Sequence, residues 1–335
     1  MNNTEKDDLV TVLGHFNWEK ITGAVFLSPM ILLGVLGNIL TLLVFGTRQQ
    51  RQTSIAIYLS ALAASDIIVL ILPAMEFWLY HVLHIYIRRS SDFMCRLFSY
   101  ATSVLPCVSA WILVAVSTER MMGVCAPLKM KVFSKPKHAF IIVAAITAAV
   151  SAIFIPLLPA TFLVQNAGLS MCVIDESILT VKVLTALEIT FLFALPFLIM
   201  IINNSIILLQ VAGCSRWNCG KSKNNNTSGN SPQQRKVMKT ITRRVIILCA
   251  VYMMCNAPLM VLNVIWTAMV DDWVPSDKRL INDLNFIFHI LLYLNNSVNF
   301  FLYCLIGSSF RNDCMKMKLI FIRKLRALCH IGKYH

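Results

Sequence analysis

Seven long apolar stretches run through this 335-residue chain, and they constrain its fold more than any other feature. A helix needs about 20 apolar residues to cross the roughly 30 Å hydrocarbon core of a bilayer. The stretches are too long for the strands of a membrane barrel, which take about 10 residues of alternating polarity. The sequence therefore predicts an all-α membrane protein, a seven-transmembrane helix bundle. The helices are expected at residues 21–46, 55–80, 93–124, 138–164, 180–211, 238–270 and 281–306.

The composition agrees with a chain that is dissolved mainly in lipid. Hydrophobic residues make up 57% of the chain and charged residues 14%, whereas a typical soluble domain is near half apolar and a quarter charged. A soluble core of this size would leave too few charges for its surface. The 12 glycines and 11 prolines are also too few for a collagen-like or low-complexity chain.

Basic residues gather on one side of the predicted bundle. Most of the 30 Lys and Arg residues follow the first, third, fifth and seventh helices. Cytoplasmic loops carry such an excess, so we expect a plasma-membrane protein with an extracellular N-terminal tail (1–20) and a cytoplasmic C-terminus. The basic face also suits anionic inner-leaflet lipids. The net charge of +14 is then a topology signal, and nucleic acid is not an expected partner. The polar segment 212–236 predicts a flexible cytoplasmic loop.

Two cysteines lie on the predicted outer side of the membrane. Arg120 closes the third helix at its inner end, and Cys95 lies about 25 residues earlier, roughly 37 Å of helix, which is enough to cross the bilayer. Cys172, in the loop after the fourth helix, is the other outer cysteine. Because this side is oxidising, we expect a Cys95–Cys172 disulfide that pins the loop over the mouth of the bundle.

Short motifs along nearly the whole chain resemble those of the rhodopsin-like (class A) G-protein-coupled receptors. In chain order they are Gly34-x-x-Gly37-Asn38, Leu62-Ala63-x-Ser65-Asp66, Glu119-Arg120 with Val124 and Pro127-Leu128, Leu195-Pro196-Phe197, Cys255-x-x-Pro258, Asn299-Phe300-x-x-Tyr303 and Ser309-Phe310-Arg311. Each motif is weak alone, but together they stand in order and on the expected sides. The resemblance implies a receptor, not an enzyme, whose partners are an extracellular ligand, a heterotrimeric G protein, arrestin and a receptor kinase. It also implies a receptor domain over 21–306 and a short amphipathic eighth helix with a cytoplasmic tail over 307–335.

One carboxylate, Asp66, is expected in the middle of the membrane, where a charge is costly and is by default functional. By the resemblance it groups with Ser109, Asn295 and Asn299. The oxygens of these side chains suit a sodium ion. The alternative is a water-filled polar cluster that only links the helices. No other cofactor is expected.

The resemblance assigns G-protein coupling and switching to Glu119, Arg120, Leu128, Pro258, Asn299 and Tyr303. In the family the arginine is released on activation and meets the G protein. Pro258 breaks the backbone hydrogen bonds of the sixth helix and would let it swing. The basic run 235–244 is expected to face the G protein or the lipid headgroups.

Several positions depart from the family pattern. Met121 replaces a common tyrosine, Asn256 a tryptophan, Phe300 a proline and Asn204 a tyrosine. The base of the sixth helix also carries no acidic residue to hold Arg120. We therefore expect raised basal signalling.

Residues near the outer end narrow the ligand class. Thr102 stands where amine receptors carry an aspartate, and the stretch 284–306 has no lysine to hold retinal. The passage 299–305 resembles the seventh helix of neuropeptide receptors, including those for amidated peptides of the FMRFamide type. The residues expected at the ligand are Glu76, Thr102, Glu188, Trp266 and Asp283. Acidic groups at the mouth attract a cation, so a short basic or amidated neuropeptide is expected, with Trp78, Tyr100 and Trp266 against its aromatic end.

Other interpretations remain at this point. The ligand is alternatively a lipid or another small molecule, with the carboxylates as solvated charges and the aromatics as an interfacial belt. A transporter or channel is disfavoured because no internal repeat is visible. Two modifications are also expected: glycosylation at Asn2, which begins an Asn-x-Thr sequence, and a palmitoyl anchor at Cys314.

Overall fold

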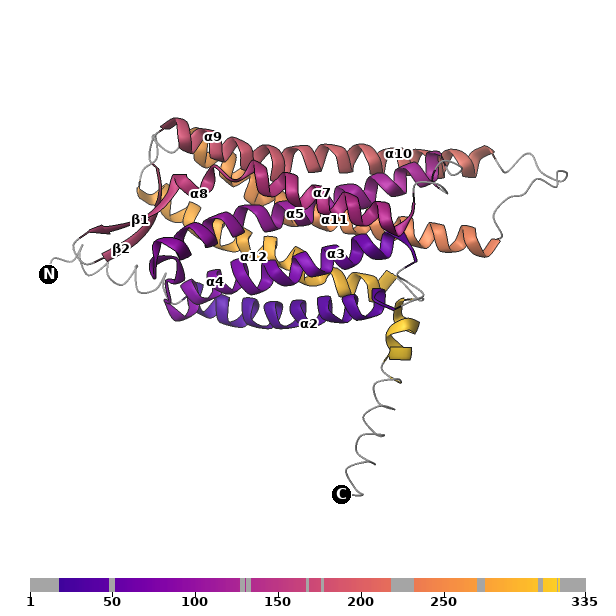
Figure 1. Ribbon diagram of the computed structural model, residues 1–335, viewed down its shortest axis with the longest axis horizontal. Coiled ribbons are helices and arrows are strands. Elements are labelled where there is room, and N and C mark those ends of the chain that lie inside the picture. The colour runs from indigo at the N-terminus through magenta and orange to yellow at the C-terminus, as the bar shows by residue number, and fades with distance from the viewer. Residues whose placement is uncertain are drawn as a thin grey trace, which may run out of the picture.

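The computed structural model describes residues 18–47, 52–126, 130, 134–166, 169–175, 178–217, 232–269, 275–306, 310–317 and 319. Within these residues, seven helices are long and apolar enough to cross a membrane. They span Trp18–Phe45, Ser54–Leu83, Asp92–Cys125, Pro136–Ala160, Lys182–Gln210, Thr242–Ile265 and Arg279–Ile306. The predicted seven-helix membrane bundle is confirmed. Figure 1 shows the helices lying side by side along one long axis.

Wide π-helical turns interrupt the first two spans. The first span contains η1 (Gly23–Leu27) and α2 (Ser28–Phe45), and the second contains α3 (Ser54–Val69), η2 (Leu70–Ala74), α4 (Met75–Trp78) and η3 (Leu79–Leu83). Pro73 lies inside η2. Its ring nitrogen cannot donate a backbone hydrogen bond, which explains why the regular ladder is interrupted there.

The other elements follow in chain order. They are η4 (Ile87–Arg89), α5 (Asp92–Cys125), α7 (Pro136–Ile153), α8 (Leu157–Ala160), β1 (Thr161–Asn166), β2 (Leu169–Ile174), α9 (Ile178–Glu188), η5 (Ile189–Ala194), α10 (Leu195–Trp217), α11 (Pro232–Met269) and α12 (Pro275–Ile306). Side-chain caps fix two of the helix starts. The Thr53 hydroxyl accepts from the backbone N–H of Ala56 before α3, and the Ser91 hydroxyl accepts from that of Met94 before α5.

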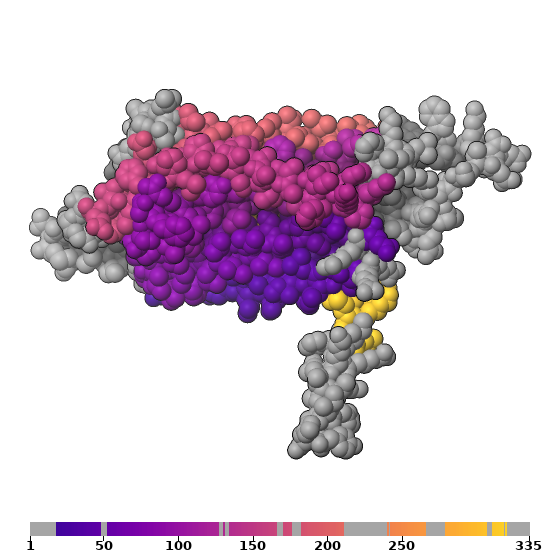
Figure 2. All heavy atoms as spheres, in the orientation of Figure 1, coloured from indigo at the N-terminus to yellow at the C-terminus, as the bar shows by residue number. Residues whose placement is uncertain are grey.

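The third span forms the centre of the bundle. Its most apolar window is 72% buried, compared with 17% for the fourth span. α5 contacts α3, α7, α10 and α11. Figure 2 shows the N-terminal helices along one edge of the molecule and the later helices along the opposite edge. Side chains carried by α5 therefore reach several other helices, whereas α7 presents most of its surface outward.

The predicted fourth helix, 138–164, is too long at its C-terminal end. α7 ends at Ile153, and after the short α8 the chain enters β1 at Thr161. Pro156 and Pro159 lack the N–H groups that a continuing helix needs. β1 and β2 pair antiparallel, with Leu163 opposite Cys172. The loop after the fourth helix is thus a β-hairpin, which the sequence reasoning did not predict.

Two segments that the sequence predicts to be cytoplasmic also differ from their predicted bounds. α10 continues to Trp217 and α11 begins at Pro232, so both helices extend into the predicted loop 212–236, while residues 218–231 lie outside the described part. Beyond α12, residues 310–317 are helical. In Figure 1 this yellow segment turns away from the long axis of the bundle. An amphipathic eighth helix along the membrane stays a prediction.

We expect Gly34→Ala to destabilise the bundle by about 1–3 kcal/mol, the usual cost of overpacking a close interface. A Cβ at Gly34 would come within 2.7 Å of the Leu70 Cδ1 and within 2.8 Å of the Ser297 Cβ. The measurement is the thermal unfolding midpoint of the purified protein. Gly123→Ala is the matched control, because a Cβ there would meet nothing within 4 Å. Equal midpoints for the two variants would refute the close contact at Gly34.

Candidate functional site

A buried carboxylate joins three helices in the middle of the bundle. Asp66 on α3 is 0% exposed. Its Oδ2 accepts a 2.6 Å hydrogen bond from the Asn299 amide of α12. Its Oδ1 accepts from the Ser109 hydroxyl of α5 at 3.3 Å, and Ser109 also lies 2.8 Å from the Ser65 hydroxyl. The structure therefore brings Ser109 and Asn299 to Asp66, and adds Ser65. Asn295 is buried but is not among the groups that hydrogen-bond to this carboxylate.

The charge of Asp66 has no basic partner in the described part of the chain. None of the ion pairs found there includes it. A buried, unpaired carboxylate is unstable unless it takes up a proton or binds a cation. The carboxylate and the two serine hydroxyls provide oxygen atoms, which suit a hard cation such as sodium. The residues present therefore fit the expected ion.

A second polar cluster lies near the C-terminal end of α5, around Glu119 and Arg120. Both side chains are buried, with 8% and 6% of their surface exposed. The Arg120 guanidinium donates to the Glu119 Oε1 at 2.9 Å. The same oxygen accepts from the Ser134 hydroxyl at 2.7 Å and from the Ser54 hydroxyl. Glu119 therefore links α5 to the start of α3 and to the segment before α7. It also keeps the Arg120 side chain against α5. We call this group of four side chains the Glu119 cluster.

Helix α10 contributes an amide close to the Glu119 cluster. Asn203 donates to the Ser117 hydroxyl at 3.0 Å and to the Thr118 hydroxyl at 2.9 Å. The next residue, Asn204, is one of the departures from the family pattern, and its side chain is also buried. The contacts of Asn203 fix α10 against the C-terminal part of α5.

Pro258 and Tyr303, which the resemblance assigns to switching, lie in α11 and α12. Pro258 is inside α11. Tyr303 is buried, and its ring meets those of Phe45 and Phe310 at centroid distances of 5.9 and 5.5 Å. Phe300 packs against α2: a Cβ at Gly37 would come within 2.8 Å of the Phe300 Cβ. Phe300, which replaces the usual proline, thus fills the close contact between α2 and α12.

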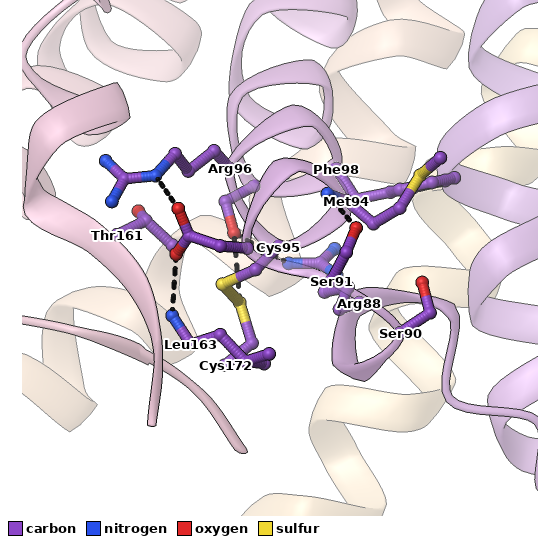
Figure 3. The surroundings of a disulfide bond; sticks show 12 residues. Arg88, Ser90, Ser91, Met94, Cys95, Arg96, Phe98, Thr161, Leu163 and Cys172 are labelled. Carbon is purple, nitrogen blue, oxygen red and sulfur yellow. Dashed lines mark hydrogen bonds and ion pairs between the residues drawn. A yellow bond between two sulfur atoms is a disulfide. The ribbon is translucent and has the colours of Figure 1, made fainter. Parts of the chain in front are cut away.

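At the opposite end of the bundle the disulfide is present. Cys95 of α5 bonds to Cys172 of β2, with their Cα atoms 5.5 Å apart, which confirms the predicted pair (Figure 3). Asp92 reinforces this attachment, because its Oδ1 accepts from the backbone N–H of Leu163 on β1 at 3.0 Å. Arg96 then joins the Asp92 carboxylate at 2.6 Å and the Leu158 carbonyl at 2.6 Å. The hairpin is therefore fixed to α5 through both of its strands.

The acidic residues expected at the ligand already have partners within the chain. Both Glu76 oxygens accept from Arg88, at 2.8 and 3.0 Å. Glu188 is partly exposed and accepts from the Ser103 hydroxyl. Asp283 accepts from the Trp18 indole at 3.2 Å. Each of these three carboxylates therefore has a hydrogen-bond donor from within the chain.

Two of the aromatic residues expected at the ligand link helices instead. The Trp78 indole donates to the Ser28 hydroxyl at 2.8 Å, and the Tyr100 hydroxyl donates to the Ser151 carbonyl at 2.8 Å. Thr102 accepts from Arg88 at 2.8 Å and so belongs to the Glu76–Arg88 group. Trp266 lies in α11, and its side chain is outside the described part.

Comparison with known proteins agrees with this arrangement. Residues 37–303 match the family described as 7 transmembrane receptor (rhodopsin family). The chain belongs to this family. Among its relatives, the cholecystokinin receptor of Xenopus laevis is 26% identical over 88% of this chain and 75% of its own length. The human neurotensin receptor type 1 is 24% identical over 92% of this chain and 77% of its own length. A neuromedin U receptor homolog of Caenorhabditis elegans is 32% identical over 43% of this chain and 35% of its own length.

Family membership and the seven apolar spans make this receptor a multi-pass protein of the plasma membrane. Two of its expected site residues, Leu128 and Asn2, lie outside the described residues. Cys314 is half-buried, and burial raises the pKa of its thiol to about 11. The structure therefore shows the setting of Cys314 but no modification.

The receptor also has an aromatic cluster that sequence reasoning missed. Phe77 stacks on His289 of α12 with 5.1 Å between ring centroids and meets His81 at 4.4 Å and Tyr293 at 5.7 Å. His81 in turn lies 2.9 Å from the Glu19 carboxylate. The spacing of Phe77 and His81 placed both on one helix face, but only the fold brings α12 against that face.

Proposed function

We propose that this receptor binds an extracellular peptide at the disulfide end of the bundle and activates a heterotrimeric G protein at the Glu119–Arg120 end. The observation that carries the proposal is the near full-length similarity to the cholecystokinin and neurotensin receptors, whose names specify peptide ligands. The hairpin, held to α5 by a disulfide and by Asp92, fits a fixed entrance for such a ligand. Arrestin and a receptor kinase are the further partners that we propose.

The orientation belongs to the same proposal. A disulfide forms on the oxidising side of a membrane, so the Cys95–Cys172 end would face outward. The excess of Lys and Arg around the other end would then be cytoplasmic, beside anionic lipids. Asn2 would be available for glycosylation outside and Cys314 for palmitoylation inside.

A ligand screen tests the proposed function. Cells that express the receptor together with a G-protein dissociation sensor are exposed to a peptide library and to fractionated tissue extracts. We expect at least one peptide to produce a saturable response that is lost in Arg120→Ala at equal surface expression. An active extract fraction that survives complete peptidase digestion would favour a lipid or other small molecule instead. Ion current or solute uptake without G-protein dissociation would favour a transporter or channel.

We also propose that Asp66 binds sodium. Its burial, the oxygens of Ser109 and Ser65, and the lack of a basic partner among the described residues support this ion. A bound ion would supply the positive charge that the buried carboxylate otherwise lacks. Because Asp66 links α3, α5 and α12, the ion would favour the arrangement seen in this structure.

Sodium chloride is therefore expected to raise the thermal unfolding midpoint of the purified receptor above its value in N-methylglucamine chloride of equal ionic strength. Binding stabilises by about 1.4 kcal/mol when the ion is at about ten times its Kd. Asp66→Asn should abolish the difference between the two salts. Asp313→Asn, which alters a surface ion pair with Lys316, should retain it. A sodium effect that persists in Asp66→Asn would place the ion elsewhere.

A further inference from the structure

The sequence predicts that Glu76 pairs with a cation on the ligand, but the structure shows that the chain supplies this cation itself. Arg88, in η4 between the second and third spans, binds Glu76 through Nε to Oε1 at 2.8 Å and through Nη2 to Oε2 at 3.0 Å. Such a two-point contact is among the strongest that a carboxylate makes. A basic ligand would have to displace this bond to reach Glu76.

Two further contacts hold the guanidinium in one orientation. Its Nη2 donates to the Thr102 hydroxyl oxygen at 2.8 Å, and Thr102 itself donates to the Phe98 carbonyl at 2.6 Å. Its Nη1 lies at a long 3.5 Å from the Ser99 hydroxyl. Nη1 is thus the least satisfied edge of a side chain whose position is already fixed. A ligand group that binds there would not have to order the arginine first.

Exposure and position decide which member of the pair an incoming ligand meets. The Arg88 side chain is 30% exposed, whereas that of Glu76 is 13% exposed. Ser99 also lies 3.9 Å from the Cys172 sulfur, and Figure 3 shows Arg88 close to the disulfide. The guanidinium is therefore the more exposed member of the pair and lies beside the disulfide.

We propose that Arg88 is the anchor for an anionic group of the peptide ligand, a C-terminal carboxylate or an Asp or Glu side chain, and that Glu76 is a positioning residue. This inference rests on the proposed peptide ligand, but it reverses the charge that the sequence predicts for it. Glu76 holds Arg88 in place, and Thr102 keeps its Nη2 occupied. The Nη1 edge then offers a directed, charge-assisted hydrogen bond to the incoming carboxylate.

The sign of the local field can be measured without any ligand. A cysteine is introduced by Thr102→Cys, and its labelling rate is measured by mass spectrometry with sulfonatoethyl methanethiosulfonate, an anion, and trimethylammonioethyl methanethiosulfonate, a cation. Each reagent forms a mixed disulfide with the thiolate and releases methanesulfinate. Rates are divided by those for a free thiol in solution, and the unsubstituted receptor gives the background. We expect the anionic reagent to react about 5- to 10-fold faster.

Three second substitutions in this background separate the roles of the pair. Arg88→Ala should reverse the preference, because it uncovers Glu76, and Glu76→Gln should increase it. Arg89→Ala is the matched control, since Arg89 lies over the Tyr86 ring at 4.1 Å and outside this network. Equal rates for the two reagents, faster labelling by the cation, or a preference that Arg88→Ala and Glu76→Gln leave unchanged would overturn the proposal. Glu76→Gln retains the arginine and decides the question if Arg88→Ala fails to fold.

Peptide pools then test the ligand. Three pools of short peptides are matched except that one position carries Asp, Asn or Arg, and each is made as the free acid and as the amide. The Asp or free-acid pools should activate the receptor, and Arg88→Ala should weaken them about 10- to 100-fold. The double exchange Glu76→Arg with Arg88→Glu should favour the Arg pool. Activation of the unaltered receptor by the Arg pool alone would overturn the inference and leave the proposed function intact. If no peptide or extract acts at all, the proposed function fails, and the labelling rates still decide the sign of the site.

Discussion

Glu119→Gln is expected to raise basal nucleotide exchange on the G protein about 3- to 10-fold. The carboxylate holds Arg120 at 2.9 Å and also accepts from Ser54 and Ser134, so removing its charge weakens every contact of the Glu119 cluster at once. A hydrogen bond to a charged group contributes about 1.5–3 kcal/mol. A shift of about 1.4 kcal/mol multiplies a sparsely populated active state roughly tenfold. The measurement is guanine-nucleotide exchange by purified G protein with the receptor in bilayer discs.

Graded variants distinguish this explanation from a general loss of stability. Ser54→Ala and Ser134→Ala each remove one donor and should raise the basal rate less than Glu119→Gln. Asp175→Asn, which removes a carboxylate at the disulfide end of the bundle, should leave the rate unchanged. If Glu119→Gln and the unaltered receptor gave equal rates at equal receptor concentration, the cluster would not restrain Arg120. The absence of an acidic residue at the base of the sixth helix makes this cluster the main candidate for that restraint.

Removing the disulfide with Cys95→Ser and Cys172→Ser is expected to destabilise the receptor by about 2–4 kcal/mol. The bond closes a loop between residues that are 77 positions apart, and without it the hairpin loses its covalent link to α5 and is held by non-covalent contacts such as the Asp92–Leu163 hydrogen bond. The measurement is the unfolding midpoint from intrinsic tryptophan fluorescence. The response to any activating peptide should weaken in parallel, because the hairpin would no longer hold one position over the entrance.

Treatment with a reducing agent provides an internal check on this second prediction. It should lower the midpoint of the unaltered receptor towards that of the double variant and leave the double variant unchanged. Cys125→Ser is the matched control, because Cys125 is an exposed free cysteine. A midpoint that neither the double substitution nor reduction lowers would show that Asp92 and the strand pairing are sufficient to hold the hairpin.

Much of the fold follows from local properties of the chain. The seven spans could be predicted because lipid requires every helix to be long and apolar. The disulfide could be predicted because few cysteines lie on the oxidising side. The predicted end of the fourth helix, at residue 164, was wrong. The apolar run continues past the helix into β1, which begins at Thr161. Hydropathy does not distinguish helix from strand there. The signals that do are Pro156, Pro159 and the following Thr161 and Val164.

The candidate sites divide in the same way. Asp66 could be singled out from sequence alone, because a carboxylate in the middle of an apolar run is costly. Its contact with Asn299 joins residues 233 positions apart and depends on how α3 meets α12. The aromatic cluster of Phe77, His81 and His289 likewise needs two helices to be adjacent.

The amino-acid sequence by itself determined that this is a membrane protein, that it crosses the bilayer seven times and that few of its buried positions carry a charge. These properties depend on each segment's own free energy of transfer into lipid, which needs no knowledge of its neighbours. Only the tertiary structure decided which charges are neutralised and which remain available. The charge of Glu76 suits an external cation, yet Arg88 binds this carboxylate and is the more exposed member of the pair. Electrostatic energy depends on the distance between groups, and that distance is set by the packing of the whole bundle.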